Sequence, residues 1–180
     1  NISFEFVDNK TKFLLFLSML EVMATNSSEK FLIVLRNLDD FLSYNDFVEC
    51  CEKMEFLTNY SDSLYIVLFP SNEGYLHVTK EVLEEINIVS DYVDHFYSLE
   101  FMYDRFSNQY PINQIPDEQE FLTYLRKIGS YLFSSDILHM SLSVEDQVVL
   151  KILNNLYQYK MKTKFRIESI NPMLLKYLEE

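Results

Sequence analysis

The strongest constraint on the fold is an uninterrupted apolar run from Phe31 to Leu35, which leads past Arg36 to a polar tail. A run without polar alternation is typical of a central parallel strand with helices on both of its faces. A second run of this kind spans residues 64–69, and the residues between the two runs have the spacing of one helix. The sequence therefore predicts a βαβ unit whose sheet is covered on both faces.

The neighbouring residues extend this pattern to an expected order of βαβαβ. Asp8 is placed to cap the first helix, and either Ser43 or Asn45 is placed to cap the second. The expected elements are a strand over 2–7, a helix over 10–24, a helix over 46–58, and a short strand or extended connection over 75–78. Residues 1–78 are thus predicted to form an α/β parallel sheet with flanking helices.

Residues 79–180 have mostly helical patterns and are predicted to be a helical C-terminal extension. A long helix is expected over 80–107, about 40 Å in length, because apolar residues recur there in steps of four and three. Such spacing would give a narrow seam for a partner helix. The seam residues are Val82, Ile86, Val89, Val93 and Phe96. Further helices are expected over 117–134 and 143–160 and from Pro172 onward.

Charge is segregated along the chain, whose formal net charge is −13. Residues 80–120 contain ten carboxylates and two cations, whereas residues 147–166 contain five cations and no carboxylate. As a strand, residues 159–166 would present several cations on one face, where they could contact a phosphate backbone. The predicted DNA-binding residues are Lys151, Lys160, Lys162, Lys164 and Arg166.

The basic run, residues 159–166, has one alternative interpretation. It could be a solvated edge strand whose lysines only block aggregation. Arg126 and Lys127 would strengthen the DNA-binding interpretation if the fold brought them alongside the run.

Asp39 and Asp40 follow a buried strand, as does the carboxylate that holds Mg²⁺ in P-loop NTPases. They are the candidate metal ligands, and the alternative is a helix cap or a solvated turn. No GxxxxGK[ST] or GxGxxG motif occurs in the chain, so no nucleotide is expected. His77, His95 and His139 lack the spacing of metal ligands, and no catalytic constellation is predicted.

The polar stretch after the first buried strand resembles a known family. Asn37, Leu38, Leu42, Ser43, Tyr44, Asn45 and Asp46 match its pattern. In Csn-type CRISPR-associated adaptation proteins of subtype II-A loci, a strand of the type hydrophobic-x-Asn-(Ser/Leu) leads into a helix that begins Tyr/Phe-Ser-x-(Asp/Asn)-(Asp/Glu). The resemblance covers roughly residues 2–78.

This resemblance implies a P-loop-NTPase-like fold that has lost nucleotide hydrolysis. It also implies Ca²⁺-supported tetrameric rings, binding of double-stranded DNA ends during spacer acquisition, and other CRISPR adaptation proteins as partners. The residues after 80 resemble the added C-terminal region of the larger variety of the family. The chain is accordingly expected to be the C-terminal portion of a longer protein.

The leading hypothesis is a non-enzymatic, oligomeric, DNA-binding adaptation protein of the cytoplasm. No membrane segment is expected, because no apolar run approaches the ~20 residues that cross a bilayer. Cys50 and Cys51 are adjacent in one predicted helix and poorly placed to bridge each other. The alternatives are an ATPase whose phosphate loop lies upstream, with Asp39 or Asp40 on Mg²⁺, and a helical protein-interaction module that uses the 82–96 seam.

Overall fold

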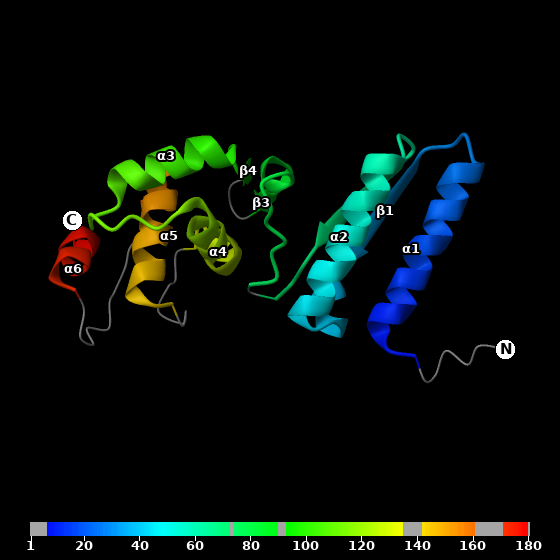
Figure 1. Ribbon diagram of the computed structural model, residues 1–180, viewed down its shortest axis with the longest axis horizontal. Helices are drawn as coiled ribbons and strands as arrows, with labels where there is room; N and C mark the ends of the chain where they lie inside the picture. Colours follow the sequence, from blue (N-terminus) through cyan, green and yellow to red (C-terminus); the bar gives the residue numbers. More distant parts are fainter. Residues whose placement is uncertain (1–6, 73, 90–92, 135–141, 161–170, 180) are drawn as a thin grey trace. The chain divides into compact units, whose positions relative to one another are not determined.

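The computed structural model describes residues 7–72, 74–89, 93–134, 142–160 and 171–179 (Figure 1). The chain divides into two compact units, Asn1–His77 and Val78–Glu180. That residues 1–78 are part of an α/β core and 79–180 its extension stays a prediction, because it concerns a longer protein. Among the described residues, no helix combines the length and the apolar composition that crossing a bilayer requires.

The first unit contains the predicted βαβ arrangement. Its elements are α1 (Asn9–Asn26), β1 (Phe31–Arg36), the 3₁₀ turn η2 (Leu38–Phe41), α2 (Tyr44–Tyr60) and β2 (Leu64–Phe69). The two strands pair in parallel, with Phe31 opposite Leu64 and Arg36 opposite Phe69. The prediction of a small parallel sheet with helices against it is confirmed, whereas a relationship to P-loop NTPases stays a prediction.

The helices of this unit begin at the predicted caps. The Asp8 side chain accepts a hydrogen bond from the Thr11 N–H at 2.9 Å, and the Ser43 hydroxyl accepts one from the Asp46 N–H at 3.3 Å. Ser43 rather than Asn45 is therefore the cap of α2. The predicted strand over 2–7 lies outside the described residues except for Val7, which is not in a strand, and residues 75–78 form an irregular connection.

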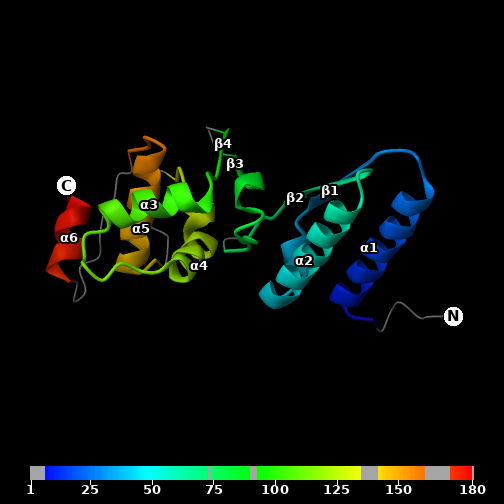
Figure 2. The ribbon, with the colours of Figure 1, turned by 45° about the horizontal axis from the view of Figure 1, so that its top comes forward.

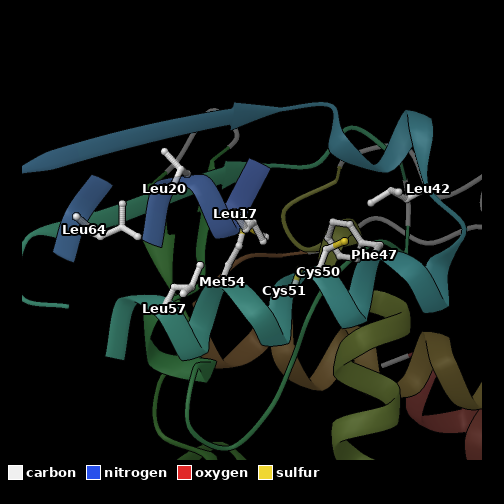
Figure 3. Packing of buried hydrophobic residues seen from close by; sticks show 10 residues of the cluster. Leu17, Leu20, Leu42, Phe47, Cys50, Cys51, Met54, Leu57 and Leu64 are labelled. Carbon is white, nitrogen blue, oxygen red and sulfur yellow. The ribbon is translucent and has the colours of Figure 1, made fainter. Parts of the chain in front are cut away.

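Both helices of the first unit pack on one face of the sheet. In two views α1 and α2 run side by side (Figures 1 and 2), and α2 directs Phe47, Met54 and Leu57 toward α1 and the strands (Figure 3). The strand residues that pack against these helices alternate along the chain and are Phe31, Ile33, Leu35, Leu64, Ile66 and Leu68.

The expectation of helices on both faces is wrong for the described residues. The residues between the packed ones, Leu32 and Val34 on β1 and Tyr65 and Val67 on β2, are exposed. The apolar run fits a strand covered on both sides, but only one covering layer is present among the described residues.

The second unit is mainly helical around α5. Its elements are η3 (Leu83–Glu85), β3 (Asn87–Val89), β4 (Val93–His95), α3 (Leu99–Gln109), α4 (Glu118–Ile128), η4 (Gly129–Tyr131), α5 (Val144–Leu156) and α6 (Pro172–Glu179). Helix α5 contacts α3, α4 and α6, and Figure 2 shows it between α4 and α6. Val148, Val149, Leu150, Ile152 and Leu153 are all buried, as a helix surrounded by others requires.

The predicted long helix over 80–107 is wrong. Strands β3 and β4 form an antiparallel hairpin with Ile88 opposite Asp94, and α3 begins only after Ser98, whose hydroxyl accepts from the Phe101 N–H. Ile88, Val89 and Val93 are β-branched, so they lose side-chain freedom in a helix and suit a pleated strand. The helical seam over 82–96 therefore does not exist.

Helices α4 and α5 begin within one residue of the predicted positions, and each follows a capping residue. Asp117 with Glu120, and Ser143 with Asp146, form complete capping boxes at α4 and α5. Helices α4 and α5 end earlier than expected. Helix α4 gives way to a 3₁₀ turn at Gly129, and α5 ends at Leu156, shortly before Gln158 adopts a left-handed φ of 58°.

The two cysteines are free and buried in the core of the first unit (Figure 3). Burial raises the pKa of Cys50 to about 11 and that of Cys51 to about 12. Because the thiolate is the reactive form, both side chains are chemically protected in the folded chain.

We expect both thiols of the folded chain to react with Ellman's reagent at pH 8 at least about a hundredfold more slowly than those of the denatured chain. Each unit by which the pKa rises lowers the thiolate fraction about tenfold, and burial restricts access further. Stopped-flow absorbance in buffer and in denaturant measures both rates. A cysteine that reacts equally fast in both conditions would contradict this packing.

Candidate functional site

The carboxyl ends of β1 and β2 carry a compact polar network. After β1 the chain turns at Asn37, which has a left-handed φ of 57°, and the Asn37 N–H donates to the Phe69 carbonyl at 3.0 Å. Asparagine tolerates this conformation better than most residues. The turn places Asp39 and Asp40 beside Ser71 and Asn72, which follow β2, as expected where parallel strands end at one edge.

Asp39 connects the turn that follows β1 to the segment that follows β2. The residue is only 3% exposed, and its Oδ2 accepts from the Ser71 N–H at 2.8 Å, the Ser71 hydroxyl at 3.1 Å and the Asn72 N–H at 2.5 Å. Oδ1 is buried and has no hydrogen-bond partner among the described residues. Burial alone would raise the pKa of Asp39, but the N–H groups of Asn72 and Ser71 stabilise the charged form, and the net pKa is lowered.

Asp40 contacts the same loop from the solvent side. Its Oδ1 lies 3.1 Å from the Ser71 hydroxyl and 3.0 Å from the Asn72 side-chain nitrogen, and Oδ2 accepts from the Asn37 side-chain nitrogen at 3.3 Å. The two adjacent carboxylates therefore bind the same pair of residues, Asp39 from inside and Asp40 from the surface.

This arrangement limits the chemistry available at the sheet edge. Successive backbone N–H groups that point to one place form a cradle for phosphate oxygens. Here the N–H groups of Ser71 and Asn72 are filled by the carboxylate of Asp39. A phosphate could bind these donors only by displacing a buried side chain.

Hydrogen-bond donors also occupy part of the predicted metal site. Three donors surround Oδ2 of Asp39, which is the wrong polarity for a metal ion. No group of three or more His, Cys, Asp or Glu side chains that could hold a metal occurs in the part of the chain that the structure describes. The metal assignment of Asp39 and Asp40 stays a prediction, and the contacts observed for them are structural.

Two of the predicted DNA-binding residues are described. The Lys151 ammonium donates to the carbonyls of Tyr177 at 2.6 Å and Leu178 at 3.2 Å, and it lies 5.1 Å from the centre of the Tyr177 ring. A cation there complements the C-terminal end of the α6 dipole. Lys160 is exposed beyond α5. Lys162, Lys164, Arg166 and most of the strand expected over 159–166 lie outside the described residues.

Arg126 and Lys127 have contacts of their own within the second unit. The Arg126 Nε donates to the Val78 carbonyl at 3.0 Å, and Lys127 forms an ion pair with the buried carboxylate of Asp146. Both cations therefore contribute to the packing of α4, and neither contact places them alongside the basic run.

An open hollow of about 580 Å³ lies along α3. Its lining includes the carboxylates of Glu100, Asp104 and Glu118 and no lysine or arginine. Negative charge of this density repels phosphate groups, so the hollow is unsuited to nucleic acid.

Sequence reasoning identified Asp39 and Asp40 as notable but missed their partners. The available signal was the polar segment Ser71–Asn72, which follows the second parallel strand just as the two carboxylates follow the first. Two such segments must meet at the same sheet edge. Which of the two carboxylates is buried depends on the turn at Asn37.

We expect Asp39→Ala to lower the free energy of unfolding by about 2–3 kcal/mol, because it leaves buried backbone donors without a charged acceptor. Asp40→Ala is the matched control, and its cost should stay below about 1 kcal/mol because its partners can turn to water. Urea denaturation followed by circular dichroism measures both. Equal losses of unfolding free energy in the two variants would contradict the inference that Asp39 stabilises the fold more than Asp40 does.

The lowered pKa of Asp39 also predicts an acid dependence. Its stabilising contribution is present above the ordinary aspartate pKa near 3.8 and is lost as pH falls through the lower folded value. Stability measured between pH 5 and pH 2 should therefore fall less steeply in Asp39→Ala than in the unchanged chain. Asp8 and Asp46, whose pKa values are also lowered, remain in both proteins as internal controls. Identical slopes would show that Asp39 does not titrate in this way.

Comparisons with known proteins give one family and one solved relative. The family model described as CRISPR-associated protein Csn2 subfamily St matches residues 1–179. The crystal structure of Stu0660 of Streptococcus thermophilus is similar, with 36% sequence identity and a TM-score of 0.87. That match covers 99% of this chain and 51% of the relative, so the chain spans about half the relative's length. A comparison with curated proteins gives no match.

Proposed function

Because the chain belongs to the CRISPR-associated protein Csn2 family, subfamily St, we propose that it acts in CRISPR-based antiviral defence as a non-enzymatic protein that binds double-stranded DNA ends during spacer acquisition. The single observation that supports this role is the match of the family model over residues 1–179. The role of the whole protein is proposed from this family membership.

The geometry at the carboxyl edge of the sheet favours a role without nucleotide hydrolysis. The chain lacks a phosphate-loop motif, and the backbone donors that follow β2 are filled by Asp39. The alternative of an ATPase requires a phosphate loop from outside this chain. The alternative of a helical interaction module loses its basis, because residues 82–96 include a β-hairpin.

The proposed DNA contact is the basic run that follows α5. Within residues 147–166 the chain has five cations and no carboxylate, against a net charge of −13 overall. Lysine and arginine at such a site bind phosphates by releasing counterions, which gives affinity without sequence preference. Lys151 anchors α6, so Lys160, Lys162, Lys164 and Arg166 are the residues proposed to contact DNA directly.

The proposal includes the assembly that the family resemblance implies. The protein would act in the cytoplasm as a homo-oligomeric ring, with a tetramer expected, supported by Ca²⁺ and together with other CRISPR adaptation proteins. Asp39 and Asp40 remain the ligands proposed for this cation, although Oδ2 of Asp39 already accepts hydrogen bonds from Ser71 and Asn72.

We expect the chain to bind a blunt DNA duplex, and the triple variant Lys160→Glu, Lys162→Glu, Lys164→Glu to bind it at least about tenfold more weakly. Fluorescence anisotropy at low and moderate salt, with and without Ca²⁺, measures both. The salt dependence of the variant should be shallower because fewer phosphates are neutralised.

The matched control is Lys12→Glu, Lys30→Glu, Lys80→Glu, which changes the net charge equally but leaves the basic run intact. It should keep most of the affinity. No binding by the unchanged chain would contradict the DNA-binding role. Equal losses in the two triple variants would contradict the assignment to the basic run.

A further inference from the structure

The parallel sheet of the first unit has an exposed apolar surface. The outer sheet face contains the apolar residues Leu32, Val34, Tyr65, Val67 and Phe69, together with Arg36 at one end, and these alternate with the strand residues that pack against the helices. Leu32 is 64% exposed and Val34 54% exposed. The strand register places Leu32 opposite Tyr65 and Val34 opposite Val67, so these side chains form one continuous surface.

Such a surface is unusual for a parallel sheet, because parallel sheets almost always have both faces covered. Neither outer edge pairs with a further strand in the part of the chain that the structure describes. Among the described residues, β1 and β2 pair only with each other, which leaves one row of backbone hydrogen-bonding groups on each strand unpaired by the sheet. A two-stranded sheet of this kind needs further strands or layers for stability.

Helix α1 also has apolar side chains that no described part of the first unit covers. Its buried residues Leu17, Leu20 and Ala24 face the core, and further apolar residues remain exposed on its other sides. The exposed set is Leu15, Phe16, Met19, Val22 and Met23. A helix that is apolar all round is normally surrounded by protein. The described part of the first unit therefore has the apolar composition of a protein interior but no further layer that covers it.

The length of the solved relative identifies what would cover the sheet. This chain matches Stu0660 over 99% of its own residues with a TM-score of 0.87, yet almost half of the relative's chain lies outside the match. We propose that the outer sheet face is the docking surface for a polypeptide equivalent to that unmatched half. This polypeptide adds at least one strand to an edge of the β1–β2 sheet and covers Val34 and Val67.

A second copy of this chain is a weaker candidate for the same surface. Two outer faces packed together would bury their apolar side chains, but the edges of β1 and β2 and the exposed residues of α1 would stay open. One polypeptide of a length comparable to this chain could cover the outer sheet face, pair with the strand edges and cover the exposed residues of α1. The proposal does not depend on DNA binding, because its test contains no DNA.

The test co-expresses this chain, carrying an affinity tag, with the untagged half of Stu0660 that lies outside the match. We expect the untagged polypeptide to co-purify in equimolar amount and the backbone amides of β1 and β2 to gain protection from hydrogen exchange. Val34→Asp should reduce the co-purified polypeptide about tenfold or more, because docking would bury an unpaired charge.

Val93→Asp is the matched control, since Val93 is also a strand valine and is 74% exposed, but lies in the hairpin of the second unit. It should leave co-purification unchanged. Circular dichroism verifies that both variants fold, as expected for exposed positions. No co-purification by the unchanged chain, equal loss in both variants, or a self-associated chain whose sheet amides are protected without the second polypeptide would each overturn the proposal.

Discussion

The parallel pairing of β1 with β2 is the interaction on which the first unit depends. Parallel neighbours cannot be joined by a tight turn, so the chain must return through a crossover, and α2 fills that role. The crossover aligns the ends of the two strands, which brings Asp39 to Ser71 and Asn72. The buried layer of α1 and α2 and the polar network at the sheet edge both follow from this one pairing.

The polar network in turn limits what the sheet edge can bind. Ligands of open α/β sheets collect at this edge, often on backbone N–H groups. In this chain the same groups hold a carboxylate of the protein itself, which stabilises the loops and occupies the donors. The α/β arrangement is therefore present while the backbone donors that could bind phosphate are occupied, and this agrees with the proposed role, in which surface cations contact DNA.

The sequence predicted the first unit better than the second, for physical reasons. Strands β1 and β2 are long apolar runs, and Ser43, Asp117 and Ser143 are strong capping residues whose effect is local. The segment from Val82 to Phe96 was ambiguous, because apolar steps of four and three fit a helical seam while its β-branched residues favour strands. The burial of Asp39 was not predictable from local sequence, since its partners lie more than thirty residues away.

Contacts within the fold also determine which cations remain available to contact phosphate. Arg126, Lys127 and Lys151 are each held by a carbonyl or a carboxylate, so the helices of the second unit use their own positive charge for packing. The chain as a whole is strongly acidic and repels DNA at long range. At physiological ionic strength charge interactions are largely screened beyond about 8 Å, so the cations that attract a phosphate are those that lie within roughly this distance of it. The proposed contact with a duplex therefore depends on cations that lie close to phosphate and not on the overall charge of the chain.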